Sequence, residues 1–159
     1  MHKPVIINNE ILNEIYSLAR NGFPSEVCGW LRGDPNNGNI TSIRPAINVY
    51  DNKNHPVVSD RTAETAYVIS SEDVLELNSE LDEPFPPLVI YHSHPNGKAY
   101  FSETDRVVAT DPWGEGPNYP VQQLVIGVSK EKIVESRLFS WSSKQKDYIE
   151  IYKHKGAEI

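Results

Sequence analysis

The chain has 159 residues, a formal net charge of −7, one cysteine and a hydrophobic share of 38%. This length and composition predict one globular domain over residues 1–159, and the negative charge argues against a nucleic-acid partner. The lone Cys28 excludes an internal disulfide, and no stretch is apolar enough for a signal segment or a bilayer span, so we expect a cytoplasmic protein without a membrane partner. No feature of the sequence indicates an oligomeric state.

The first half of the chain is expected to alternate strands and helices. A β-branched run at 5–7 precedes a helix that Asn8 or Asn9 can cap and that Gly22 ends. The apolar residues of this helix recur on one face, which is typical of a helix docked on a sheet. The other expected elements of this half are strands at 27–31 and 40–49 joined by a turn at 33–38, a polar surface excursion at 50–65 and a strand at 66–69.

The second half continues the alternation, and the whole pattern predicts an α/β domain with a central mixed β-sheet flanked by helices. The expected elements are helices at 71–81 and 102–110, strands at 88–91, 122–129 and 136–141, and a Pro/Gly-rich loop at 111–120. The strand at 88–91 is continuously apolar, which indicates a central position buried on both faces. We assign no element to the tail after about residue 142.

Two histidines follow the expected central strand in the sequence YHSHP. Because side chains along a strand point the same way at every second residue, His92 and His94 leave one face and can converge on one ion, whereas Ser93 points away. Histidines at a strand end equally well cap carbonyl groups or meet solvent, so this spacing alone does not decide between the two interpretations.

A Ser-x-x-Asp sequence follows at Ser102 and Asp105, and it too has two interpretations. Serine followed three residues later by an acid is typical of a helix N-terminus, and Ser70 and Asp73 repeat the pattern with no histidine nearby in the sequence. In combination with the histidines, however, a loop that folds back would bring the Asp105 carboxylate beside both imidazoles. Three protein ligands leave a fourth zinc position for water, as in a catalytic site. Hydrolysis also needs a carboxylate to carry a proton, and Glu26 is the candidate.

These residues together resemble the JAMM (MPN+, Mov34) metalloproteases. The resemblance rests on HSHP at 92–95, six intervening residues, Ser102-x-x-Asp105 and the upstream Glu26 in SEVCGWLRG, and it is strongest to the small prokaryotic Mec-like members. It implies a single JAMM/MPN domain of the cytidine-deaminase-like kind and one zinc ion per chain, bound by His92, His94 and Asp105. It further implies that Glu26 is the general base and acid and that Ser102 helps to hold the oxyanion.

The resemblance also implies a substrate class. Members of this type cleave peptide or isopeptide bonds after the C-terminal Gly-Gly of ubiquitin-like proteins. The Mec-like ones trim a small ubiquitin-like sulfur carrier and release a C-terminal amino acid, so such a carrier is the expected partner. Tyr100, Phe101 and Trp113 are possible walls for its tail, or core residues. The alternatives are a deconjugating protease of a bacterial ubiquitin-like or antiphage system and a non-catalytic MPN scaffold. A cupin expects a glutamate soon after the histidines, and an amidohydrolase barrel needs a longer chain, so we set both aside.

Overall fold

A mixed six-stranded sheet with helices on both faces forms the body of the protein in the computed structural model, which describes residues 3–49 and 68–159. The helices within these residues are α1 (Asn9–Gly22), α2 (Ser71–Glu80) and α3 (Glu103–Ala109). The strands are β1 (Cys28–Gly33), β2 (Ile40–Ala46), β3 (Pro87–His94), β4 (Gln122–Val128), β5 (Ile133–Ser142) and β6 (Asp147–Ala157), in the spatial order β2-β1-β3-β4-β5-β6. The expected α/β class is therefore confirmed.

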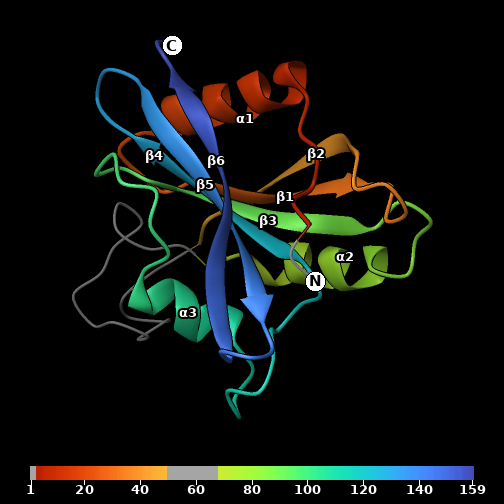
Figure 1. Cartoon of the computed structure of the whole chain (residues 1–159). Helices are drawn as coiled ribbons and strands as arrows, with labels where there is room; N and C mark the ends of the chain where they lie inside the picture. The colour runs from red at the N-terminus through yellow and green to blue at the C-terminus, as the bar shows by residue number, and fades with distance from the viewer. Residues whose placement is uncertain (1–2, 50–67) are drawn as a thin grey trace.

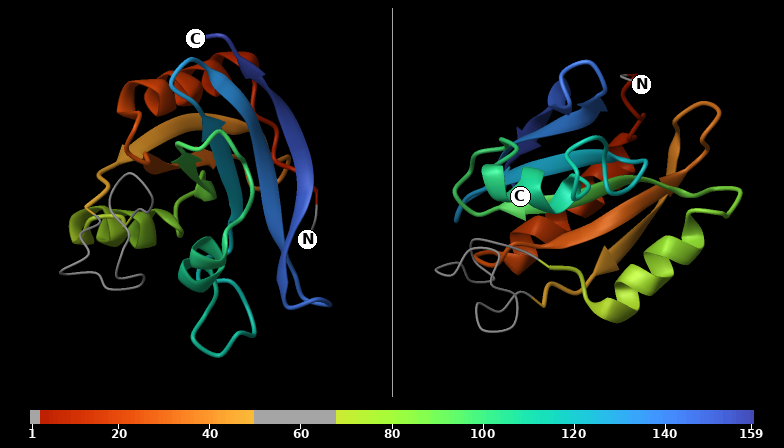
Figure 2. Two further views of the ribbon diagram at one scale, coloured as in Figure 1. Left: turned by 90° about the vertical axis from the view of Figure 1, so that its left-hand side faces the viewer. Right: turned by 90° about the horizontal axis from the view of Figure 1, so that it is seen from below.

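The helices divide the sheet into two faces, with α1 on one side and α2 and α3 on the other (Figures 1 and 2). Asn8 caps α1 by accepting a hydrogen bond from the Ile11 N–H at 2.9 Å. The apolar face of α1 then buries Ile15, Tyr16 and Ala19 against the sheet. None of the helices in the described part of the chain combines the length and the apolar character needed to cross a membrane.

The central strand β3 is parallel to β4 and antiparallel to β1. Its residues Val89 and Tyr91 belong to the core beneath α1, and Ile90 packs on the opposite face with Leu77 of α2. A further apolar cluster under α3 fills the rest of that second face, and it contains Phe101, Phe139 and Tyr148, among others. The strand is therefore buried on both faces, as its continuous apolar sequence predicts.

The structure differs from the expected elements mainly at the edges of the sheet. The expected strand at 5–7 is reduced to a bridge between Ile6 and Asn39, and the one at 66–69 to a bridge between Ile69 and Asn48, with 66–67 outside the described residues. The surface excursion at 50–65 also lies outside them. Within the tail, β6 is an 11-residue edge strand, and its Glu, Lys and His residues suit an edge that meets solvent.

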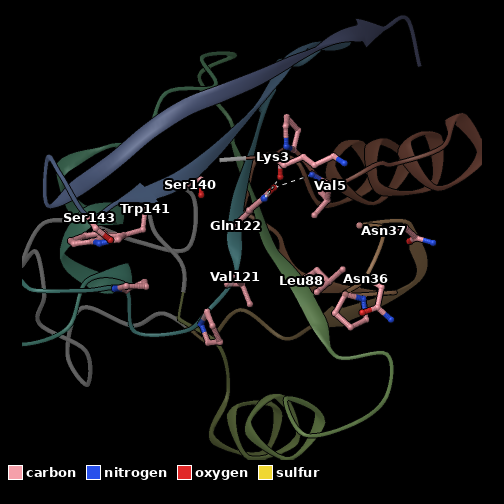
Figure 3. A pocket seen from close by; sticks show the side chains of 15 residues that line it. Lys3, Val5, Asn36, Asn37, Leu88, Val121, Gln122, Ser140, Trp141 and Ser143 are labelled. Carbon is pink, nitrogen blue, oxygen red and sulfur yellow. Dashed lines mark hydrogen bonds between the residues drawn. The ribbon is translucent and has the colours of Figure 1, made fainter. Parts of the chain in front are cut away.

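A cavity of about 430 Å³ opens at the start of β3 and β4, the end of these strands opposite to the histidines. Figure 3 shows Gln122 at its edge, where its side-chain amide is hydrogen bonded to the N-terminal segment. Gln122 Oε1 accepts from the Val5 N–H at 3.2 Å, and Gln122 Nε2 donates to the Lys3 carbonyl at 2.8 Å. One side chain of β4 thus fixes the entry of the chain into the fold.

The phenol of Tyr16 joins α1 to β5 and β6, because its hydroxyl lies 2.8 Å from Ser136 Oγ and donates to the Lys155 carbonyl at 2.8 Å. Tyr16→Phe removes both contacts and leaves the buried Ser136 hydroxyl without this partner, and we expect it to lower the free energy of unfolding by about 1–2 kcal/mol in urea titrations. The control Tyr152→Phe changes a ring that is 50% exposed and should have little effect. Equal losses in the two variants would contradict this role of Tyr16.

Candidate metal centre

Three donor atoms from β3 and α3 form a nearly equilateral triangle. The Nε2 atoms of His92 and His94 lie 3.1 Å apart, and Asp105 Oδ2 lies 3.1 Å from each of them. Donor atoms held at roughly 2.0–2.1 Å around a tetrahedral zinc ion stand about 3.3 Å apart, so this triangle has the dimensions of one face of a zinc coordination shell. All three side chains are buried. A set of two imidazoles and one carboxylate therefore fits a zinc ion in both chemistry and spacing.

Asp105 reaches the histidines because it caps α3. Ser102 Oγ accepts from the Asp105 N–H at 3.1 Å, and the Ser102 N–H donates to Asp105 Oδ2 at 3.0 Å, which makes a reciprocal capping box. The oxygen that closes this box is the same Oδ2 that contacts His92 and His94. The helix-cap interpretation and the metal-ligand interpretation of Ser-x-x-Asp are thus compatible at one atom.

The Ser-x-x-Asp sequence at Ser70 and Asp73 has only the structural role. Ser70 Oγ accepts from the Asp73 N–H at 3.2 Å, as expected of a helix cap. The Asp73 carboxylate, however, pairs with Arg44 at 2.7 Å and accepts from the Ile47 N–H at 2.9 Å. It therefore fastens α2 to the end of β2.

Hydrogen bonding fixes the tautomer of His94. Its Nδ1 lies 3.0 Å from the Lys98 carbonyl oxygen, which can only accept, so Nδ1 carries a proton and Nε2 is the nitrogen that faces the triangle. Burial raises the pKa of Asp105, but the charges and hydrogen bonds of His92 and His94 outweigh it and hold this pKa well below its usual range. The carboxylate is thus ionised, as a ligand must be.

Glu26 lies buried next to this triangle, just before β1. One ligand atom from each of Glu26, His92 and His94 lies within 4.8 Å of the other two, so these three residues could also hold a metal ion. Direct ligands of one tetrahedral zinc ion stand about 3.3 Å apart, and the upper limit of 4.8 Å also admits a carboxylate that is separated from the ion by a water molecule. The 3.1 Å separations of Asp105 are close to the ligand spacing, which makes Asp105 the candidate third ligand and Glu26 the candidate neighbouring carboxylate.

Two residues that we did not single out from the sequence fix the position of Glu26. Ser93, which points away from the histidines, accepts from the Val27 N–H at 2.8 Å through its Oγ and donates its own N–H to the Val27 carbonyl at 3.0 Å. Asn48 Nδ2 donates to the Glu26 carbonyl at 2.8 Å. The strand alternation already placed Ser93 opposite the histidines, whereas no local pattern marks Asn48.

The remaining candidate residues differ in the solvent exposure of their side chains. Phe101 is buried in the cluster under α3, which makes it a core residue, whereas Trp113 is 81% exposed on the loop after α3. The half-exposed Tyr100 places its ring 5.1 Å from that of His94, at the border of the triangle. Cys28 is buried, and burial raises the pKa of its thiol to about 12, so it is a neutral small residue.

Comparison with known proteins finds a matching family model and related peptidases. Residues 8–142 match the family model described as prokaryotic homologs of the JAB domain. The chain is 30% identical over 109 residues to the CysO-cysteine peptidases of Mycobacterium tuberculosis and Mycobacterium bovis, covering 68% of this chain and 67% of each relative.

Solved structures share the fold at lower identity. A protein from Desulfitobacterium hafniense has a TM-score of 0.62 at 20% identity, covering 91% of this chain and 87% of that one. A protein from Salinibacter ruber has a TM-score of 0.58 at 17% identity, covering 91% and 86%.

The two possible ligand sets predict different metal contents for two variants. We expect about one zinc per wild-type chain by elemental analysis, and Glu26→Gln should retain it. Asp105→Asn keeps the size of the side chain but removes a charged ligand, so zinc affinity should fall by more than ~100-fold, beyond the usual loss for a residue that only supports a ligand. Loss of zinc from Glu26→Gln together with its retention in Asp105→Asn would instead identify Glu26 as the ligand.

Proposed function

This chain belongs to the prokaryotic homologs of the JAB domain, the family that its motifs resemble, and on that premise we propose that it is a zinc-dependent peptidase of the JAMM type. The observation that carries the proposal is the buried triangle of His92, His94 and Asp105 with the Glu26 carboxylate beside it. A non-catalytic MPN scaffold has no need of all four side chains in one place, so the geometry argues against that alternative.

The reaction assigned to this site is the addition of water to a peptide or isopeptide carbonyl. A zinc ion held by three protein ligands supplies Lewis acidity, which lowers the pKa of water and polarises the carbonyl. The Glu26 carboxylate takes the proton from the attacking water and passes it to the leaving amine nitrogen. Ser102 Oγ accepts from the Asp105 N–H and still has its own proton, which we assign to the oxygen that gains negative charge.

We further propose that the scissile bond follows the C-terminal Gly-Gly of a small ubiquitin-like sulfur carrier. The support is the similarity to peptidases named for CysO-cysteine, together with the motifs of the Mec-like members. A Gly-Gly tail has no side chains to grip and is costly to order, so the folded body of the carrier must provide contacts that hold the tail extended. Tyr100 at the border of the triangle and the exposed Trp113 are the described aromatic residues available for such contacts.

A second assignment has the same chemistry with a protein as the leaving group, as in removal of a ubiquitin-like conjugate. The two assignments differ only in the group on the amine side of the bond, an amino acid or a protein. The expected supports of the carrier are the loop at 111–120, which the structure describes, and the segment at 50–65, which lies outside the described residues.

Glu26→Gln tests the catalytic assignment. The amide matches the carboxylate in size but cannot take the proton, so turnover should fall by at least ~100-fold while zinc content stays that of the wild type. Glu10→Gln makes the same change at an exposed position on α1, across the sheet from the triangle, and should leave turnover unchanged. A folded, zinc-replete Glu26→Gln protein with near-normal peptidase activity would rule out the role.

The substrate proposal is tested with Gly-Gly carriers that bear one extra C-terminal residue, followed by intact mass. We expect release of that residue from the folded carrier and much slower cleavage of a free peptide with the same tail, because the peptide lacks the contacts that order it. Equal cleavage of peptide and carrier would contradict the proposed recognition. Carriers linked to a second protein, assayed in parallel, decide between trimming and deconjugation.

A further inference from the structure

Three residues on neighbouring strands form a row that starts at the candidate metal centre. His94 of β3 pairs with Gly127 of β4, and Gly127 pairs with Glu135 of β5. Residues directly opposite one another in a sheet point to the same face, so the Glu135 side chain leaves the sheet on the side of the His94 imidazole. Between them stands a residue with no side chain.

The space above Gly127 is filled by the turn that follows β3. A Cβ at Gly127 would lie 2.5 Å from the Gly97 carbonyl oxygen and 2.7 Å from its carbonyl carbon, which are backbone atoms that cannot rotate away. Gly97 itself has a φ of +79°, a conformation that favours glycine. The two glycines thus let the turn lie flat on β4, between the imidazole and the carboxylate.

One peptide unit of this turn bridges the two side chains. At one end, the Lys98 carbonyl accepts a hydrogen bond from His94 Nδ1 at 3.0 Å. At the other end, the N–H of Ala99, which belongs to the same peptide bond, donates to Glu135 Oε2 at 3.4 Å. Arg137 holds the carboxylate at 3.1 and 3.2 Å, and Lys153 lies 3.4 Å from it. The order is therefore carboxylate, peptide, imidazole.

Such an arrangement affects the imidazole because a peptide group is polarisable. A negative charge at the N–H end draws the N–H bond and increases the negative charge on the carbonyl oxygen, and hydrogen bonds in series strengthen one another in this way. A stronger acceptor at Nδ1 fixes the ring and makes Nε2 a more basic ligand, as a carboxylate does when it contacts a ligand histidine directly.

We propose that Glu135 is a positioning residue for His94, acting through the peptide bond between Lys98 and Ala99 to orient the ring and strengthen its Nε2 as a metal ligand. The proposal rests on the metal centre proposed above. In this role Glu135 acts on the ion without touching it, because the turn lies between its carboxylate and the His94 imidazole.

The test compares two neutralising variants, Glu135→Gln and Glu150→Gln. Both glutamates pair with Arg137, Glu135 at 3.1 Å and Glu150 at 2.9 Å, so each variant removes one negative charge and an ion pair with the same arginine, and Glu135→Gln also removes the ion pair with Lys153. Only Glu135 also accepts from Ala99 in the described residues. Zinc dissociation constants are measured by competition with a chelator of known affinity. We expect Glu135→Gln to bind zinc ~3- to 10-fold more weakly, below the loss for a direct partner of a ligand, and Glu150→Gln to match the wild type.

Two further measurements separate the peptide relay from a general effect of charge. The Nδ1 proton of His94, observed by NMR in the zinc-loaded protein, should exchange faster with water in Glu135→Gln and at the wild-type rate in Glu150→Gln. The affinity difference should persist when salt rises from about 0.05 M to about 0.5 M, because salt screens a field through solvent but not a hydrogen-bonded contact. A difference that disappears in high salt overturns the proposal.

The remaining outcomes are also decisive. Equal zinc affinities for wild type and Glu135→Gln, or equal weakening in both variants, overturn the relay but leave the metal centre intact. A wild-type protein that binds no zinc overturns both. If Glu135→Gln does not fold, Glu135→Asp replaces it. This variant keeps the charge but withdraws the carboxylate by one methylene from Ala99, so the same loss of affinity and faster proton exchange are expected, and their absence contradicts the proposal.

Discussion

Side chains alternate along β3, so that one face of this strand packs beneath α1 and the other face carries the candidate metal ligands. Val89 and Tyr91 point into the core beneath α1, whereas Ile90, His92 and His94 point to the other face. A shift of the strand by one residue would turn both imidazoles toward α1 and turn Val89 and Tyr91 toward the face of α2 and α3. The hydrophobic energy that holds α1 on the sheet therefore also fixes the face from which the histidines project.

On that face, α3 provides the buried carboxylate of Asp105, and several contacts offset the cost of burying its charge. An ionised group removed from water is costly unless it is paired and hydrogen bonded. Asp105 Oδ2 is met by the Ser102 N–H at 3.0 Å and by two imidazoles at 3.1 Å each, so the cap of the helix and the candidate ligand set stabilise one oxygen together. The Asp105 carboxylate, a candidate metal ligand, thus also holds the start of α3 against the end of β3.

The sequence predicted those parts that depend on neighbours along the chain. Helix caps, the apolar central strand and the common face of the two histidines all follow from local spacing, and each is present. Local spacing could not distinguish Asp73 from Asp105. Their roles depend on their partners, Arg44 and the two histidines, which lie on strands distant in the sequence. The edge strand β6 was missed because charged residues interrupt its apolar pattern. Glu135 joins the row of His94 only through the registers of β3 with β4 and of β4 with β5.

The same dependence on distant segments links an ion at this centre to folding. Glu26 comes from the segment just before β1, the histidines from β3, Asp105 from α3 and Glu135 from β5, so the donor set exists only when the sheet is in register. A ligand that binds the native state and not the unfolded chain stabilises the native state, by about 2.7 kcal/mol at a concentration 100-fold above its dissociation constant. Coordination would also replace the contact of two buried imidazole nitrogens at 3.1 Å with bonds to one cation. The residues that make the centre reactive are thereby also the ones through which an ion would hold three distant parts of the chain together.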